Sequence, residues 1–575
     1  MPLPILSISE VEALESNLIT QGCTLDNLIT TAVKAISTWV REHYPRAAFP
    51  SSGLLVGCGH NGADALGTGV ELLKEGRHVI ALVLSAREQL KPATADVAQK
   101  FESAGGIICF MTDGPPEDRP CPECSNNNEQ WLHEDLAHKN LTLLSSLSFW
   151  LDGLHGFGLN RSLSKHHLQW IQWIQHCKRP IVAIDLPSGL HADFGVLEST
   201  ESNDKGKPAS AQCLRASETL ALGVLKPVHV LDNSIEAMGR IHLLDLGYVP
   251  PDSVPIQPKT KPTVQSQVSF CALSAGDLAP LLFKARRSPS SHKHDNGRLL
   301  IVAGSEKFPG AAVMACLGAS VSGAGLIHAI IPRSARDSVL IHTPEVIFEN
   351  DCPDLSRFDA IVLGPGWVVD DSESSSDQTF TDPSLERKEL FEKIISHIKS
   401  HRQTACVVDA GAFELLADFF HKGGVLNERF ILTPHAGEFA RLFPLISERL
   451  GTHNHAQRLN RLSAALGATQ QSKATVYFKG ARTCIAATGQ GLEDIAHVHT
   501  LLQSSSLLAH AGHGDVVAGL LGGLLARGLD TFSAGCLAAL MQSQCALAFE
   551  HRYPAALTLT PIDCVRSLKS LGRQT

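Results

Sequence analysis

Hydrophobic and polar residues follow two different periods along the first part of the chain. Apolar residues spaced three and four positions apart predict amphipathic helices over residues 8–19 and 25–42. An apolar run at 52–59 that ends in glycine, a helical pattern at 61–76 and a second apolar run at 78–84 come next. This order predicts a βαβ unit whose loop lies at the carboxyl end of the first strand.

Two more apolar runs in the first half of the chain each end in an acid, Asp152 and Asp185. In the second half a further series of apolar runs alternates with helical patterns, in the segments RLLIVAG, LIHAIIP, DAIVLGPG, ACVVDAG, FILTPHAG and TVYFKGA. Short apolar runs that alternate with helical stretches are typical of mostly parallel sheets. The pattern therefore predicts the α/β class in both halves, with ligand groups at the carboxyl ends of the strands.

The length of the chain predicts more than one domain. A chain of 575 residues is longer than a single hydrophobic core usually supports. Residues 248–267 are rich in proline and have no period, which is typical of a linker. We place the first domain at 1–250, the linker at 251–267 and the second domain at 268–575.

Composition indicates a protein that acts on small molecules. The chain is 44% hydrophobic and 19% charged, with a net charge of −9. A mildly acidic chain lacks the basic surface that attracts nucleic acid or an anionic membrane, so we expect neither partner. The first residues lack the pattern of a signal peptide, and the glycines of residues 311–331 favour a buried helix followed by a strand over a membrane span. We expect a cytoplasmic protein that forms a homo-oligomer.

The cysteines give no metal signal. Cys121 and Cys124 are the only close pair of note among the 15 cysteines, and no second pair at comparable spacing follows. We therefore expect reduced thiols and no zinc site. The polar runs 115–128 and 370–382 are predicted to be surface loops.

The most informative motif of the second half is the stretch AHAGHGDVVAGLLGGLLARG, in which Asp515 follows Gly512 and Gly514 at the start of an apolar helix. The glycines permit a tight turn, so backbone N–H groups can face an anion while Asp515 faces a substrate hydroxyl. Such an arrangement suits phosphoryl transfer to an alcohol, in which positioning and charge stabilisation do most of the work. An ordinary loop before a buried helix is the alternative for this motif alone.

In the first half, three loops are expected along one sheet edge. The loop GCGHNGADAL carries Asn61 and Asp64, and the other two carry Asp152 and Asp185 with Ser188. Oxygen atoms of Asn61, Asp152 and Ser188 suit a weakly held alkali cation, which leaves Asp185 for acid–base work. A plain βα turn is the alternative for the first loop.

Ordered motifs over nearly the whole chain resemble a known family. GCGHNGADALGTGVELLKEGRHV, DGLHGFGLNR, DLPSGLHADFG and TLALGVLKP resemble the N-terminal domain of the NAD(P)H-hydrate epimerases. HKHDNGRLLIVAGSEKFPGAAVMA, LGPG, ILTPHAGEFARLF, FKGARTCIA and AHAGHGDVVAG resemble the ribokinase-like domain of the ADP- or ATP-dependent NAD(P)H-hydrate dehydratases. The resemblance implies a fused, bifunctional repair enzyme with a Rossmann-like first domain and a ribokinase-like second domain.

The implied activity restores NADH and NADPH that have been hydrated at C6 of the nicotinamide ring, forms called NADHX and NADPHX. The second domain would phosphorylate the C6 hydroxyl with ADP or ATP and expel phosphate, and the first would interconvert the two C6 epimers. The resemblance makes Asp515 the base on that hydroxyl and Glu438 a candidate for arranging Mg²⁺. It places Ala311, Gly366 and His435 against the hydrated cofactor, and Lys479, Gly480, Ala481, Arg482, Thr483 and Gly514 on the adenine nucleotide.

For the first domain the resemblance implies K⁺ held by Asn61, Asp152 and Ser188, and Asp185 as the catalytic group. The residues that it places on the hydrated cofactor are His60, Asn61, Gly62, Ala63, Asp64, Gly156, Phe157, Gly158, Leu159, Asn160 and Arg161, together with Asp185.

The chain departs from the family pattern mainly in the first domain. His60, Ala63 and Ala65 replace an asparagine and two glycines of the epimerase loop, and Thr30 stands where a glutamate is usual. A methyl group at Ala63 is expected to crowd a pyrophosphate. Two other interpretations stay open from the residues alone, because a fold does not settle a function: a vitamin or sugar-alcohol kinase, and a nucleotide-binding protein whose first domain has decayed.

Overall fold

The computed structural model describes residues 2–112, 144–196, 213–247, 268–368, 383–401, 403–450, 458–489 and 495–571. The chain divides into two compact units, Pro4–Lys261 and Pro262–Thr575, with Met1–Leu3 assigned to the second. Cys121 and Cys124, the proline-rich stretch and both polar runs expected to be surface loops lie outside the described residues.

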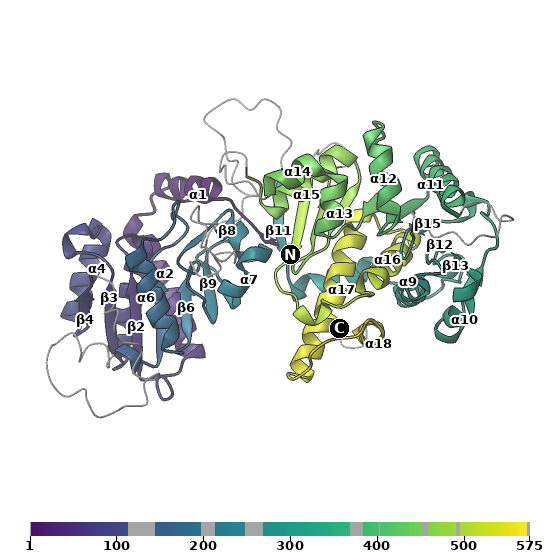
Figure 1. The fold of residues 1–575 in the computed structure, drawn as a ribbon. Coiled ribbons are helices and arrows are strands. Elements are labelled where there is room, and N and C mark those ends of the chain that lie inside the picture. The colour runs from purple at the N-terminus through teal and green to yellow at the C-terminus, as the bar shows by residue number, and fades with distance from the viewer. Residues whose placement is uncertain are drawn as a thin grey trace. The chain divides into compact units, whose positions relative to one another are not determined.

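The first unit is built on a seven-stranded parallel sheet, in the order β10-β9-β6-β5-β2-β3-β4, as far as the described residues show (Figure 1). The strands are β2 (Ser51–Val56), β3 (His78–Val83), β4 (Ile107–Phe110), β5 (Phe149–Gly153), β6 (Ile181–Ile184), β9 (Glu218–Leu222) and β10 (Arg240–Leu244), with a short hairpin of β7 (Leu190–His191) and β8 (Gly195–Val196). The helices are α1 (Ile8–Thr20), α2 (Leu25–His43), α3 (His60–Lys74), α4 (Pro92–Ser103), α6 (Lys165–His176) and α7 (Ile235–Met238).

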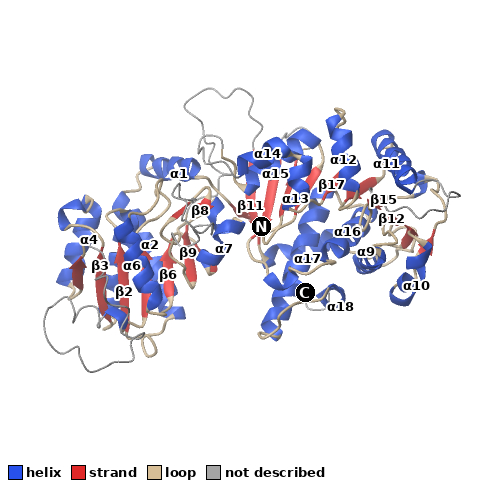
Figure 2. Ribbon diagram, in the orientation of Figure 1, coloured by secondary structure: helices blue, strands red, loops and turns tan. Residues whose placement is uncertain are grey.

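Alternation along the strands divides the core of this unit into two layers. Leu54 and Val56 of β2 pack with apolar residues of α2, α3 and α4, whereas Leu55 packs with Trp170 and Ile174 of α6. Successive side chains of a strand point to opposite faces, so a fully apolar strand needs a helical cover on each side. Figure 2 shows helices on both sides of the strands.

The order of the strands places a ligand site in this unit. The chain runs from β2 outward to β3 and β4, and then returns to β5 on the other side of β2. Open α/β sheets bind ligands at such a reversal, outside the carboxyl ends of the strands. The ends of β2 and β5 carry the loop of Asn61 and the residue Asp152, respectively.

The second unit contains a larger mixed sheet, with eleven strands in the described part of the chain, in the order β1-β11-β20-β19-β18-β17-β16-β15-β12-β13-β14. The strands are β1 (Leu3–Pro4), β11 (Val268–Leu273), β12 (Arg298–Val302), β13 (Leu326–Ile330), β14 (Ile347–Phe348), β15 (Ala360–Leu363), β16 (Ala405–Val408), β17 (Phe430–Leu432), β18 (Thr475–Phe478), β19 (Cys484–Ala487) and β20 (Ala496–Leu501). β19 pairs antiparallel with β18 and β20, whereas β12 to β18 pair in parallel.

Helices cover this sheet as well (Figure 2). Their bounds are α8 (Leu278–Lys284), α9 (Pro309–Ser322), α10 (Arg333–His342), α11 (Pro383–Ser400), α12 (Ala412–His421), α13 (Ala436–Leu442), α14 (Pro444–Leu450), α15 (Arg461–Ser472), α16 (His513–Ala526), α17 (Thr531–Arg552) and α18 (Pro561–Leu571). The expected α/β class is confirmed in both units, and so are the predicted βαβ unit and the helix and strand of residues 311–331.

Close contact with α9 holds the start of α16 in place. A Cβ on Gly318 of α9 would lie 2.0 Å from the carbonyl oxygen of Val516, and one on Gly519 of α16 would lie 1.9 Å from that of Ala315. The two backbones touch because both positions lack a side chain. Asp515, in the first turn of α16, is therefore carried by a rigid pair of helices.

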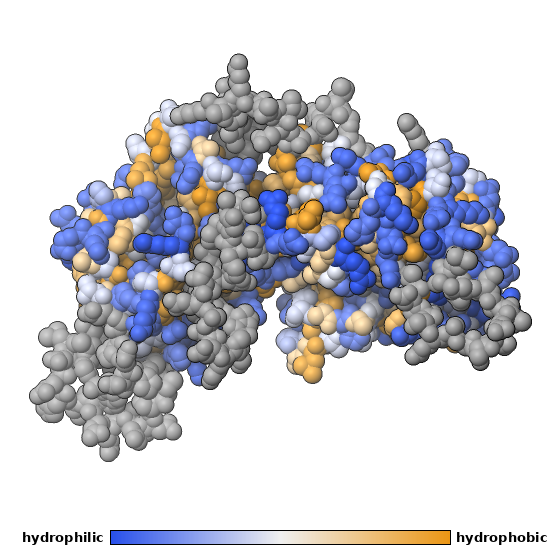
Figure 3. Space-filling model, turned by 45° about the horizontal axis from the view of Figure 1, so that its top comes forward, coloured by the Kyte–Doolittle hydropathy of each residue, from blue (hydrophilic) through white to orange (hydrophobic). Residues whose placement is uncertain are grey.

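Among the described residues, one helix, Thr531–Arg552, is long and apolar enough to cross a membrane by length and composition, and 67% of its apolar window is buried in the unit. This degree of burial is typical of a core helix. On the described part of the face drawn in Figure 3, hydrophobic residues are interspersed with hydrophilic ones.

Candidate active sites

Three of the predicted dehydratase residues, His435, Lys479 and Asp515, lie at the carboxyl edge of the second sheet together with Asp409, which the sequence analysis did not predict. Asp409 follows β16, His435 follows β17 and Lys479 follows β18, while Asp515 lies in the first turn of α16. Carboxyl ends of parallel strands share one edge, so residues more than a hundred positions apart in sequence come together there.

Lys479 is the centre of a small charged cluster. Its Nζ lies 2.8 Å from Oδ1 of Asp409 and 3.7 Å from Oε2 of Glu438. Burial lowers the pKa of Lys479, but the two carboxylates outweigh burial and raise it overall. The ammonium group therefore stays charged, with donors directed toward the site.

Asp515 has the properties of a general base. Burial, reinforced by the charges of Asp409 and Glu438 and opposed by Lys479, raises the pKa of Asp515 to about 7. A carboxylate with a pKa near the working pH accepts a proton more effectively than an ordinary aspartate. The structure places Gly514 beside Lys479, since a Cβ on Gly514 would lie 3.5 Å from the lysine Nζ.

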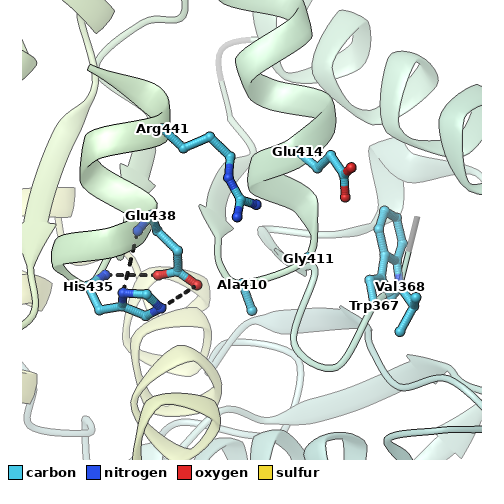
Figure 4. Close-up of a pocket in the computed structure, with 8 residues that line it drawn as sticks. All are labelled: Trp367, Val368, Ala410, Gly411, Glu414, His435, Glu438 and Arg441. Carbon is cyan, nitrogen blue, oxygen red and sulfur yellow. Dashed lines mark hydrogen bonds and ion pairs between the residues drawn. The ribbon is translucent and has the colours of Figure 1, made fainter. Parts of the chain in front are cut away.

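His435 is the N-cap of α13 and forms a capping box with Glu438 (Figure 4). The Nδ1 atom of His435 accepts a hydrogen bond of 3.0 Å from the N–H of Gly437, and the N–H of His435 donates to Oε2 of Glu438 at 2.8 Å. The imidazole Nε2 lies 3.5 Å from Oε1 of Glu438. Since Nδ1 accepts, the ring proton is on Nε2.

The remaining predicted residues of this domain lie in distinct surroundings. Gly366 has a φ of +70°, and a Cβ built on it would lie 2.5 Å from the Cβ of Ala311, so these two residues adjoin. In the loop after β18, Gly480 and Ala481 are exposed, whereas Arg482 and Thr483 are buried. Only the first part of that loop offers open surface to a nucleotide.

A cavity of about 530 Å³ opens beside this cluster. His435 and Glu438 line it together with Trp367, Val368, Ala410, Gly411, Glu414 and Arg441 (Figure 4). Its volume lies in the range of ligand cavities. Glu438 joins the cavity to the cluster because it both lines the cavity and pairs with Lys479.

The charged cluster fits Mg²⁺ in the way that this ion usually binds nucleotides. Three carboxylates, Asp409, Glu438 and Asp515, act on the same lysine. Among the described residues, however, no group of three or more His, Cys, Asp or Glu is arranged to hold a metal ion. Mg²⁺ is commonly held by one or two carboxylates together with water and substrate phosphates. This cluster can supply the carboxylates.

In the first domain, Asp185 is fixed by several independent contacts. Its Oδ1 lies 2.5 Å from Nζ of Lys226, and its Oδ2 accepts a hydrogen bond of 3.2 Å from the N–H of Phe157. The backbone of Asp185 has a φ of +66°, a left-handed conformation that is rare for residues other than glycine and is common at functional sites. Its carbonyl oxygen lies 2.8 Å from Nε2 of the buried His229, which keeps this conformation in place.

The predicted cation ligands lie at the reversal of the strand order. Ser188 donates its N–H and its Oγ–H to the two carboxylate oxygens of Asp152, at 2.8 and 2.7 Å. The side chain of Asn61 donates to the carbonyl oxygen of Ile184, which directs its own oxygen away from that strand. Burial raises the pKa of Asp152 to about 6, and no cationic residue contributes to the shift. A buried carboxylate without a cationic partner among the described residues fits a bound K⁺.

Two more acids act on Asp185 and Lys226. Burial and the neighbouring Asp185 and Glu15 raise the pKa of Asp64 well above its usual value, and its buried Oδ1 has no hydrogen-bond partner in the described structure. Burial also raises the pKa of Glu15, in helix α1, against the opposing charge of Lys226. The structure thus brings three carboxyl groups close together, and Lys226 acts on two of them, Asp185 and Glu15.

The other residues that we expected on the hydrated cofactor in the first domain fall into two groups. His60, Gly158, Asn160 and Arg161 are exposed, and Asn61, Gly156 and Phe157 are partly exposed. Gly62, Ala63 and Leu159 are buried, and Ala63 belongs to the core cluster of α2, α3 and α4. The methyl group of Ala63 therefore packs against apolar side chains.

Sequence reasoning missed Asp409, Lys226 and Glu15. Asp409 and Lys226 come shortly after apolar strands. A polar residue after an apolar run is the signal that identified Asp152 and Asp185, and the same signal could have identified Asp409 and Lys226. Glu15 lies on an amphipathic helix among other acids, and nothing in the sequence distinguishes it.

Comparisons with known proteins match the two halves of the chain to two different family models. Residues 25–228 match the family model described as YjeF-related protein N-terminus, and residues 299–567 match the model described as NAD(P)H-hydrate dehydratase. The bifunctional NAD(P)H-hydrate repair enzyme Nnr of Gloeobacter violaceus is 29% identical over 540 residues, which cover 91% of this chain and 89% of that protein. The enzyme of the same name from Escherichia coli is 28% identical over 528 residues, covering 90% and 83%.

Among solved structures, the ADP/ATP-dependent NAD(P)H-hydrate dehydratase from Bacillus subtilis, co-crystallised with ATP and Mg²⁺, is similar with a TM-score of 0.38. It is 23% identical and covers 50% of this chain and 93% of its own.

The fold and the two family matches define a two-domain α/β enzyme, with a YjeF-related N-terminal domain followed by an NAD(P)H-hydrate dehydratase domain. The chain belongs to the family of bifunctional NAD(P)H-hydrate repair enzymes.

Proposed function

We propose that this chain repairs both epimers of NADHX and NADPHX. The first domain interconverts the R and S epimers at C6, and the second dehydrates the S epimer with ADP or ATP as phosphoryl donor. The observation that carries this proposal is the position of Asp515, a base with a pKa of about 7 beside Lys479 at the start of a buried helix. The family membership supports the same assignment.

In the second domain, Asp515 takes the proton of the C6 hydroxyl while the oxygen of that hydroxyl attacks the terminal phosphorus of the nucleotide. Lys479 offsets the negative charge of the transferred group. Phosphate then leaves as the C6–O bond breaks and a proton leaves C5, which restores the double bond of the reduced nicotinamide. The carboxylates of Asp409 or Glu438 would hold Mg²⁺, which would neutralise charge at the nucleotide phosphates.

In the first domain, Asp185 and Lys226, which form an ion pair, would act as the acid–base pair on the substrate. Asn61, Asp152 and Ser188 would hold K⁺, which supplies fixed positive charge at the mouth of the site. The phenyl ring of Phe157 lies 5.5 Å from Nζ of Lys226 and covers this pair.

The experiment that tests the function uses the full chain and an epimer mixture of NADPHX, with and without ADP and Mg²⁺. We expect recovery of NADPH absorbance with release of one phosphate per cofactor. A stable phosphorylated product would instead identify a small-molecule kinase, and no turnover with either nucleotide would contradict the proposal.

Replacement of Lys479 by alanine should raise the apparent KM for ADP more than the KM for NADPHX, because the ammonium group acts on phosphate charge. Steady-state kinetics with each substrate varied in turn measures both constants. The matched control is Lys422→Ala, an exposed lysine at the end of α12, which should leave both unchanged. The opposite ranking of the two KM values would remove Lys479 from the nucleotide site.

Potassium should raise turnover of the R epimer, and Ser188→Ala should weaken that response. The substitution removes the hydroxyl that donates to Asp152 at 2.7 Å and a proposed K⁺ ligand. We expect the K⁺ concentration for half-maximal R-epimer turnover to rise, while turnover of the S epimer stays constant. An unchanged K⁺ response in a folded Ser188→Ala protein would exclude this cation site.

A further inference from the structure

Besides Glu438, the cavity beside the dehydratase site is lined by two charged side chains of opposite sign, which come from different helices. Arg441 reaches in from α13 toward Ala410 and Gly411, and Glu414 reaches from α12 on the side of Trp367 (Figure 4). Both side chains belong to exposed residues, so the cavity is open to a soluble ligand. Neither charge is needed for the phosphoryl transfer described above.

Arg441 is available to a ligand. In the described part of the chain its side chain forms no hydrogen bond or ion pair, and the same holds for the side chain of Glu414. Arg441 follows Glu438 by three positions on the same helix, so the two side chains share a face. The oxygens of Glu438 already serve His435 and Lys479, which leaves the guanidinium group of Arg441 unpaired.

The two proposed substrates differ only at the 2′ position of the adenosine ribose. NADPHX carries a phosphate on the 2′-oxygen of its adenosine ribose, where NADHX has a hydroxyl. A guanidinium group binds a phosphate through paired, charge-assisted hydrogen bonds, whereas a carboxylate accepts a hydrogen bond from a ribose hydroxyl and repels a phosphate. Dinucleotide sites commonly use these two residue types for this distinction.

We propose that this cavity receives the adenosine ribose of the hydrated cofactor, with Arg441 bound to the 2′-phosphate of NADPHX and Glu414 to the 2′-hydroxyl of NADHX. The inference rests on the proposed function and adds the residues that set its cofactor preference. His435 lines the same cavity, so one end of the ligand lies at the dehydratase site.

The test measures kcat/KM for S-NADPHX and S-NADHX separately in Arg441→Ala and Glu414→Ala. Loss of Arg441 should lower the value for S-NADPHX by about ten- to a hundredfold, the range expected for a charge-assisted contact, and leave S-NADHX nearly unchanged. Loss of Glu414 should shift the ratio in the opposite direction, lowering the value for S-NADHX and sparing S-NADPHX. The control is Arg333→Ala, an exposed arginine on α10 that should change neither.

Changes in opposite directions cannot come from a general loss of folding, which would affect both substrates equally. Equal losses of kcat/KM for both substrates in Arg441→Ala would place Arg441 on the shared pyrophosphate and overturn the proposal. An unchanged kcat/KM for both substrates would also overturn it.

A binding measurement separates this inference from the proposed function. Asp515→Asn protein is mixed with NADP⁺ or NAD⁺ and the dissociation constants are determined by calorimetry. Adding Arg441→Ala should weaken binding of NADP⁺ alone. If the wild-type enzyme fails to restore NADPH, the function is wrong while this readout still reports on Arg441. If the wild type is active and the preference for NADP⁺ is unaffected, the inference is wrong.

Discussion

Asp515→Asn is expected to lower the rate of S-epimer dehydration by on the order of 10²–10⁴-fold, the usual cost of losing a general base. The variant should fold normally, because asparagine has the shape of aspartate and burial already favours the uncharged form of this side chain. Affinity for ADP should change little, since Lys479 and the loop that follows it are intact. Initial rates of NADPH recovery and ADP titration measure the two effects.

The pH dependence gives a second readout of the same group. A base with a pKa of about 7 is protonated below that pH, so kcat/KM of the wild-type enzyme should fall as the pH drops through about 7. Because the charge of Lys479 lowers the pKa of Asp515, the acid limb should move to higher pH in Lys479→Ala. Asp337→Asn, at an exposed aspartate of α10, should keep the wild-type profile. Near-normal turnover in Asp515→Asn would exclude this base.

Much of the fold was predictable because its strands are buried on both sides. Parallel strands covered by helices appear in the sequence as short apolar runs, and β2, β6, β12 and β16 all follow this pattern. The strands that were not predicted also have a physical explanation. β19 runs antiparallel to both of its neighbours, and nothing in its residues shows this, since the direction of a strand depends on its connections. β20 differs from the fully apolar strands because apolar and polar residues alternate along it.

The candidate sites were only partly predictable. Asp152, Asp185 and Asp515 were recognised because each lies beside a strand end or a glycine turn. The ion pairs of Lys479 with Asp409 and of Lys226 with Asp185 join residues 70 and 41 positions apart, so only the folded chain reveals them. Our expectation that the methyl of Ala63 faces a pyrophosphate depended on the direction of one helix face, and the structure turns that face toward the core.

Asp185→Asn is expected to remove turnover of the R epimer above its spontaneous epimerisation while sparing the S epimer, because only the first domain uses this carboxylate. The structure favours asparagine over alanine for this test. Lys226 is almost fully buried against Asp185, and alanine would leave that ammonium without its ion-pair partner, with only the carbonyl oxygen of Leu222 at 3.3 Å, at a cost of about 3–5 kcal/mol. Asparagine keeps an oxygen near Lys226 and tolerates the left-handed backbone at this position.

The two reactions report on different domains of one protein, so each epimer serves as the control for the other. In Asp185→Asn, NADPH recovery from an epimer mixture should show a normal fast phase from the S epimer, followed by a slow phase at the spontaneous rate. The exposed Asp96→Asn should retain both fast phases. If Asp185→Asn consumes both epimers at the wild-type rate, this carboxylate is not the epimerase group. In that case the contacts to Lys226, Phe157 and His229 stabilise the loop after β6, and the first domain is structural or regulatory.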